Sequence, residues 1–142
     1  MVEEVTLDSS VLVSAFVKGD EFRPIARRIL EKIFSGKYHA VTSPVVSVEV
    51  CGAISRRAGI DKAISAKDQL AKWESMKLIT YSELTEKRRK KSVELAIKLK
   101  LRGMDAMVVQ VAEEKGGNLI TFDEEMAEKA GEAVKVLTHK DL

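Results

Sequence analysis

Four acidic residues occupy positions in this sequence that point to metal-ion chemistry. Asp8 and Asp123 each follow a short apolar segment of strand type. Glu49 stands between two valines, and Asp105 lies in the first turn of an expected helix beside core-facing positions. Carboxylates in such places would lose hydration and repel one another, and a divalent cation is the simplest means of keeping them ionised. Because hard oxygen donors without histidine or cysteine suit Mg²⁺ or Mn²⁺ better than zinc, we expect one of these ions as cofactor.

A site built only from carboxylates suits the hydrolysis of phosphate esters. In that chemistry a metal ion neutralises the phosphate and lowers the pKa of a bound water. A second ion about 4 Å away stabilises the attacking and leaving oxygens together. The acids therefore predict a phosphoester hydrolase.

Each acid taken alone also has an ordinary structural explanation. Asp8 and Asp105 suit a helix cap or first turn, and Asp123 suits a helix start. Glu49 has no such explanation. We expect the neighbouring Glu124 and Glu125 to be solvated, although either could assist a metal ion.

The segments around these acids alternate between strands and helices. Strands are expected at residues 2–7, 39–42, 78–81, 118–122 and 134–137. Helices are expected at 11–16, 25–36, 43–59, 60–73, 85–101, 105–116 and 124–131. Short strands separated by helices predict an α/β fold with three α/β/α layers and a small parallel sheet, formed by one domain over residues 1–142. Sites in such folds lie at the carboxyl ends of the strands.

The segment that carries Glu49 allows two interpretations. Four nearby β-branched valines favour a strand. Against this, Ser43 and Pro44 form a typical helix start, and the pattern continues to Gly59, which is too long for an ordinary strand. We favour a helix.

The overall charge does not by itself predict a nucleic-acid partner. Twenty-four Lys and Arg against twenty-two Asp and Glu give a net charge of +2. The densest positive run, residues 87–91, spreads around most of a helix circumference. Cations near a helix amino terminus oppose the helix dipole at a cost of about 0.3–1 kcal/mol each. The run is therefore either a solvated helix start or a contact surface for phosphates.

Two other features bear on compartment and core. Cys51 is the single cysteine, which rules out an internal disulfide and fits a reducing compartment. The chain begins with an acidic segment and has no apolar stretch of signal or membrane-spanning length. We expect a cytoplasmic protein in which Cys51 is a core residue, and in which Trp73 belongs to the core or to an interface and not to a base-stacking platform.

Four segments, in this order, resemble the PIN domain family of ribonucleases, particularly the VapC-like toxins of prokaryotic toxin-antitoxin pairs. They are residues 7–10 (Leu-Asp-Ser-Ser), the helix of Glu49 at 43–56, residues 104–106 (Met-Asp-Ala) and residues 119–123 (Leu-Ile-Thr-Phe-Asp). The resemblance covers the whole chain. It implies a PIN-like nuclease domain, an endoribonuclease activity and a small antitoxin partner.

The resemblance also implies roles for the four acids. Asp8 and Asp105 would be the principal metal ligands, Asp123 would complete the metal site, and Glu49 would orient or activate water. Ser10 and Thr121 are either polar supports of the acids or ordinary capping and strand residues. The helices at 23–36 and 60–73 could form a homodimer face, a partner groove or core cover.

Three other functions compete with the toxin hypothesis. An RNA-processing nuclease of the same fold would carry the same site residues. A phosphoacceptor receiver domain also places an Asp at a strand end and binds Mg²⁺, but it would need paired acids early in the chain. An inactive PIN-like binding scaffold would be favoured if an acid were missing, and none is.

Overall fold

The computed structural model describes residues 2–142 and contains one five-stranded sheet. Met1, which the expected domain of residues 1–142 includes, lies outside the described residues. The strands are β1 (Glu3–Leu7), β2 (Tyr38–Thr42), β3 (Ile79–Tyr81), β4 (Asn118–Ile120) and β5 (Val136–Leu137).

The sheet is parallel throughout, with strand order β3-β2-β1-β4-β5. Val5 of the central strand pairs with Ala40 on one side and with Asn118 on the other. All five carboxyl ends therefore lie at one edge of the sheet. The predicted α/β class and small parallel sheet are confirmed.

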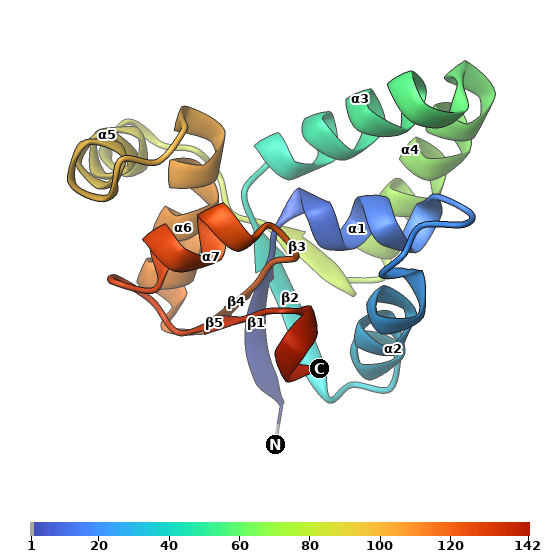
Figure 1. The fold of residues 1–142 in the computed structure, drawn as a ribbon, viewed down its shortest axis with the longest axis horizontal. Coiled ribbons are helices and arrows are strands. Elements are labelled where there is room, and N and C mark those ends of the chain that lie inside the picture. Colours follow the sequence, from blue (N-terminus) through green and yellow to red (C-terminus); the bar gives the residue numbers. More distant parts are fainter. Residues whose placement is uncertain (1) are drawn as a thin grey trace.

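Helices cover both faces of the sheet. They are α1 (Ser9–Phe16), α2 (Arg23–Phe34), α3 (Val45–Ala58), α4 (Ile60–Ser75), α5 (Glu86–Leu99), α6 (Gly103–Lys115), α7 (Glu124–Ala130) and the 3₁₀ helix η1 (His139–Asp141). In Figure 1, α1, α2 and α4 lie on one side of the strands, and α6 and α7 on the other. The three expected layers are present. Among residues 2–142, no helix is long and apolar enough to cross a membrane.

Side-chain caps fix where three of these helices begin. Asp8 accepts a hydrogen bond from the Ser10 amide, Thr85 from the Arg88 amide, and Asp123 from the Met126 amide. An oxygen at this position satisfies an amide that has no partner within the helix. The predicted starts of α1, α5 and α7 therefore hold to within two residues.

The helix interpretation of the Glu49 segment is confirmed, with a small change at its start. α3 begins at Val45, so Pro44 takes the capping position that we expected for Ser43. Ser43 still supports the first turn, because its carbonyl accepts from the Val46 amide at 3.0 Å. Glu49, three residues after Val46 and next to Val50, lies at the edge of the helix face that carries these two fully buried valines.

The core continues from the sheet into the layer of α1, α2 and α4. Leu12 is fully buried, and burial of such a side chain stabilises the fold by roughly 1.5–3 kcal/mol. Trp73 is buried and stacks on Phe16 with ring centroids 5.5 Å apart. Cys51 packs against this core while staying partly exposed. The core interpretation of Trp73 is confirmed, and that of Cys51 holds only at the edge of the core.

Candidate active site

The carboxyl edge of the sheet brings the ends of β1 and β4 together. Asp8 directly follows β1, is 4 % exposed, and donates its amide to the Ile120 carbonyl at 3.0 Å. β4 ends at Ile120, two residues before the predicted strand end at residue 122, so Asp123 does not follow the strand directly. The prediction was wrong because hydroxyl groups take over the pairing here. The Phe122 amide donates to Ser10 Oγ at 3.0 Å, and the Asp123 amide donates to Thr121 Oγ1 at 3.1 Å.

Two hydroxyl groups hold the Asp8 carboxylate. Ser10 Oγ donates to Asp8 Oδ2 at 2.7 Å, and Thr121 Oγ1 donates to the same oxygen at 2.9 Å. The Ser10 amide also points to Oδ2, at 3.4 Å. These contacts partly replace the hydration that burial removes. Because all three of these contacts fall on Oδ2, none of them occupies the other oxygen of Asp8, Oδ1.

Glu49 has an environment in which a negative charge is unfavourable. Its Oε1 is buried and has no hydrogen-bond partner among the described residues. Burial, followed by the charges of Asp8 and Asp105, raises the pKa of Glu49 from 4.5 to about 7, with the Ser9 hydroxyl acting in the opposite direction. Glu49 is therefore poised to exchange a proton near neutral pH.

Asp105 is the third residue of α6 and is partly buried. Burial, followed by the charges of Asp8 and Asp123, raises its pKa from 3.8 to about 6, and the Arg102 guanidinium partly offsets this rise. Asp8 and Asp105 are thus each coupled to other acids of the site. Asp123 is exposed at the site's outer side, where its Oδ1 accepts from the Met126 amide at 3.1 Å.

The structure thus places the four predicted acids in one neighbourhood. Asp8 acts on Glu49 and on Asp105, and Asp123 acts on Asp105. Figure 1 shows that α1, α3 and α6 all begin at the carboxyl edge of the sheet. The amino ends of helices carry partial positive charge, which favours anionic groups at this place.

The candidate ligands are of the chemical type that binds a hard divalent cation. Every candidate ligand is a carboxylate, two of them have raised pKa values, and one buried oxygen lacks a partner. In the described part of the chain, no three His, Cys, Asp or Glu side chains lie close enough together to form a ready-made metal site. A Mg²⁺ ion commonly takes one or two carboxylates and keeps several waters, so a pair of these acids is the smallest set that would hold one. Asp8 and Asp105, whose charges act on each other, are the pair that the sequence predicts as principal ligands.

The other charged groups fall into two classes. Glu124 is exposed and pairs with Lys140 at 3.5 Å, as expected for a solvated residue. Glu125 borders the site, because its charge acts on Asp105. Within the cationic run at 87–91, several members pair with acids: Arg88 with Glu114 at 2.9 Å, Lys90 with Glu86 at 3.3 Å, and Lys91 with Glu113 at 3.9 Å. These pairs favour a solvated helix start over a phosphate-binding surface.

Two residues near the acids were not identified from the sequence. Ser9 lies beside Glu49, and its signal was the tandem serine after Asp8. Arg102 stands three residues before Asp105 at the capping position of α6 and lines a small hollow with Asp105 and Asp123. A cation next to an acidic helix start was the signal for Arg102.

Comparisons with known proteins agree with this fold. Residues 5–132 match the PIN domain family, and the chain belongs to that family. This membership replaces the receiver-domain alternative. A search of curated proteins found no match to the sequence.

Several solved structures are similar to this one. VapC20 of Mycobacterium tuberculosis, a toxin that cleaves the sarcin-ricin loop, is 20% identical with a TM-score of 0.71, covering 87% of this chain and 93% of its own. VapBC2 of Rickettsia felis, bound to a promoter DNA fragment, is 14% identical with a TM-score of 0.70, covering 95% and 98%. A toxin-antitoxin complex from Klebsiella pneumoniae is 17% identical with a TM-score of 0.68, covering 97% and 99%. The fold is therefore that of the VapC toxins.

The raised pKa of Glu49 predicts a specific dependence of stability on pH. Between its ordinary pKa of 4.5 and about 7, the folded protein binds more protons than the unfolded chain. The free energy of unfolding therefore falls as the pH rises through this range. Glu49→Gln removes the ionisation, so the variant should be more stable than the wild type above this range, and the difference should shrink below the lower pKa.

Urea unfolding followed by circular dichroism in EDTA measures this difference at each pH. Glu128→Gln, an exposed acid on α7, is the matched control and should follow the wild-type profile. Parallel profiles for the wild type and Glu49→Gln would contradict the environment assigned to Glu49.

Proposed function

We propose that this chain is a Mg²⁺- or Mn²⁺-dependent endoribonuclease and the toxin of a toxin-antitoxin pair. The observation that carries the proposal is the crowding of four acids at the carboxyl edge of a PIN domain, where burial and mutual repulsion raise the pKa values of Glu49 and Asp105. Such crowding is relieved by a divalent cation, which would also neutralise the negative charge of a phosphodiester.

Asp8 and Asp105 would be the principal metal ligands, and Asp123 would complete the set from the outer side. Ser10 and Thr121 fix the orientation of Asp8 through its Oδ2. When bound, the cation would neutralise the phosphate and lower the pKa of a coordinated water. The metal dependence rests on the donor chemistry and on the crowding of the acids.

Glu49 would supply the proton-transfer step. A water attacks the phosphorus of the RNA backbone, and its proton passes to the Glu49 carboxylate as the new P–O bond forms. The bond from phosphorus to the leaving oxygen then breaks, that oxygen takes up a proton from solvent water, and Glu49 returns its proton to the solvent. A carboxylate whose pKa is about 7 is suited to both receiving and releasing a proton near neutral pH.

A small protein partner is the second part of the proposal. The similar structures from Rickettsia felis and Klebsiella pneumoniae are toxin-antitoxin assemblies. Here, a cavity of about 440 Å³ lies between α1, α2 and α4, with Phe16 and Trp73 among its lining residues and the half-exposed Phe34 beside them. Arg27 and Lys62 also line it. These side chains suit an apolar anchor flanked by acidic groups on a partner.

We also propose a cytoplasmic homodimer. The side chains of Ile60 and Ile64, one turn apart on α4, are 69 % and 48 % exposed. Adjacent exposed isoleucines are typical of a surface that a second protein covers.

An RNA-processing nuclease is the alternative function, and it would need the same active site. A neighbouring reading frame for a small partner protein would distinguish a toxin from such an enzyme.

The nuclease proposal predicts that single carboxylate losses abolish cleavage. Asp8→Asn and Asp105→Asn should each reduce the hydrolysis of single-stranded RNA in Mn²⁺ by about 100-fold or more, the size expected when metal-assisted chemistry is lost. The readout is the cleavage rate of a labelled oligoribonucleotide, with thermal unfolding as a folding check. Glu128→Gln should cleave like the wild type. Undiminished cleavage by both Asn variants would refute the mechanism.

The toxin proposal predicts an effect on growth that depends on the active site. Induced expression of the chain in a bacterial host should stop growth, and Asp105→Asn should restore it because the metal site is lost. Co-expression of the product of a small adjacent reading frame should also restore growth. The measurement is the optical density after induction, with protein levels matched by blotting. Normal growth with the nuclease-active wild type would point to an RNA-processing enzyme instead.

A further inference from the structure

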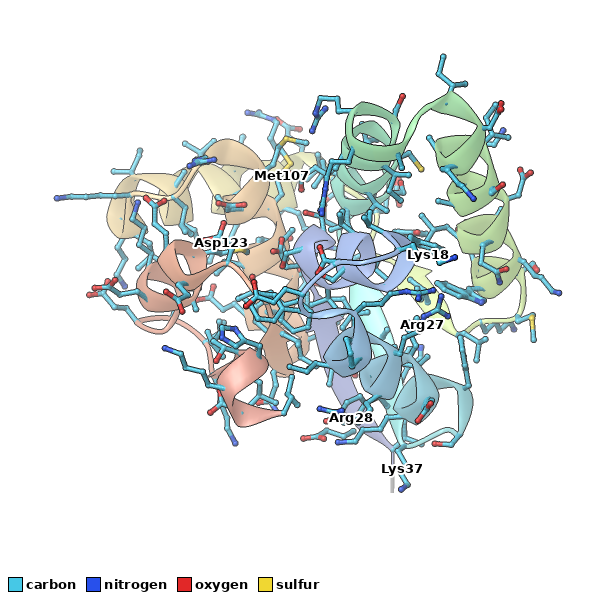
Figure 2. The ribbon with its side chains drawn as sticks, turned by 45° about the vertical axis from the view of Figure 1, so that its right-hand side comes forward. Lys18, Arg27, Arg28, Lys37, Met107 and Asp123 are labelled. Carbon is cyan, nitrogen blue, oxygen red and sulfur yellow. The ribbon has the colours of Figure 1, made fainter. Side chains whose placement is uncertain are left out.

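Two cations border the acidic site on the side of α6 and α7. Arg102 and Lys129 line the same small hollow as Asp105, Asp123 and Glu125. Figure 2 labels Asp123 on this side of the molecule, with α7 beside it. Two positively charged side chains therefore stand beside the acids on this side of the site.

The two cations differ in how firmly they are held. Lys129 Nζ donates to Glu125 Oε1 at 2.9 Å and to the Lys100 carbonyl at 3.1 Å, so it is fixed by two hydrogen bonds. The Arg102 side chain is 81% exposed, and its guanidinium lies 3.7 Å from Glu125 Oε2, beyond hydrogen-bond length. An exposed pair of this kind contributes only about 0–1 kcal/mol. Arg102 can therefore leave Glu125 for another partner with little loss of free energy.

The acids of the site would repel the phosphates of a bound RNA, and Arg102 is a positive group beside them. Four carboxylates repel the phosphates that flank a cleaved bond, and a metal ion neutralises only the phosphate it touches. The planar guanidinium offers two parallel N–H donors that match the oxygens of a phosphate. Because the Arg102 carbonyl accepts from the Ala106 amide at 2.9 Å, the residue is anchored to the helix that carries Asp105.

We propose that Arg102 is a substrate-binding residue that leaves Glu125 and contacts a backbone phosphate of the RNA beside the acidic site. In the free protein, the carboxylate of Glu125 stands beside the Arg102 guanidinium in the position that the phosphate would take. This inference rests on the proposed nuclease function and adds a positioning contact to it. It also explains why a cation stays exposed next to a group of acids instead of closing a tight salt bridge with one of them.

A different role for Arg102 would leave a different signature. If Arg102 acted only through its charge on Asp105, its loss would shift the pH profile of the reaction and leave RNA affinity unchanged. A phosphate contact changes affinity and KM, and it also changes the salt dependence of binding. The two roles are therefore separable by measurement.

The test compares Arg102→Ala, Arg102→Lys and Glu125→Gln with Arg28→Ala as control. Arg28 is an exposed arginine on α2, and Figure 2 shows it well away from Asp123. Binding of a fluorescein-labelled single-stranded RNA is followed by anisotropy in EDTA, which reports affinity without cleavage. Cleavage kinetics in Mn²⁺ then give KM and kcat separately.

Arg102→Ala should weaken RNA binding and raise KM by about 10-fold or more, because a hydrogen bond to a charged group is lost, with kcat largely kept. The slope of log affinity against log salt should become shallower by about 0.7, the value for one phosphate on a single strand. Arg102→Lys should fall between Arg102→Ala and the wild type. Glu125→Gln should bind at least as tightly as the wild type, and Arg28→Ala should match it.

The outcomes distinguish this inference from the function on which it rests. Wild-type cleavage together with unchanged affinity and KM in Arg102→Ala would overturn the role of Arg102 and leave the nuclease proposal standing. No cleavage by the wild type in Mn²⁺ or Mg²⁺ would overturn the proposed function itself. Equal losses in Arg102→Ala and Arg28→Ala would reduce the contact to general charge attraction and would also overturn the inference.

Discussion

The buried carboxylate of Asp8 is the group on which the rest of the site depends. It follows the central strand and caps α1, and one of its oxygens receives the hydroxyls of Ser10 and Thr121. The two hydroxyls come from α1 and from the segment after β4, so this oxygen ties two distant parts of the chain together. Because Asp8 cannot move without breaking these bonds, it fixes the point around which the other acids gather.

The placement of these acids lowers the stability of the folded protein. Glu49 and Asp105 ionise reluctantly because they are partly buried and face Asp8. A protein selected only for stability would separate such groups or pair them with cations, as the Arg88–Glu114 contact does on α5 and α6. Buried acids that repel one another, confined to one edge of the sheet, are typical of functional sites. A cation bound at this edge would reduce the repulsion among the crowded acids.

Much of the fold could be predicted from the sequence because local patterns are consistent with it. The Ser43-Pro44 start outweighed the valine-rich composition around Glu49, and α3 is a helix. The end of β4 was misplaced because Ser10, more than a hundred residues away, takes the Phe122 amide. A contact of this range leaves no signal in a local pattern.

The site itself was only partly predictable. Strand ends and helix starts identified which acids share an edge, but not which of them act on each other. That Asp8 acts on both Glu49 and Asp105, while Asp123 acts on Asp105, depends on how the strand order brings these segments together. Arg102 was not predicted, because a cation beside an acidic helix start is only a weak signal and its loose contact with Glu125 is visible only in the structure.

Thermal unfolding with and without Mn²⁺ tests most directly whether these acids form one cation site. A ligand that binds only the folded state at a hundredfold excess over its Kd stabilises it by about 2.7 kcal/mol. If the acids form one cation site, Mn²⁺ raises the Tm of the wild type and has little effect on that of Asp8→Asn. A Tm that does not respond to Mn²⁺ in the wild type, or that rises equally in both proteins, would contradict it.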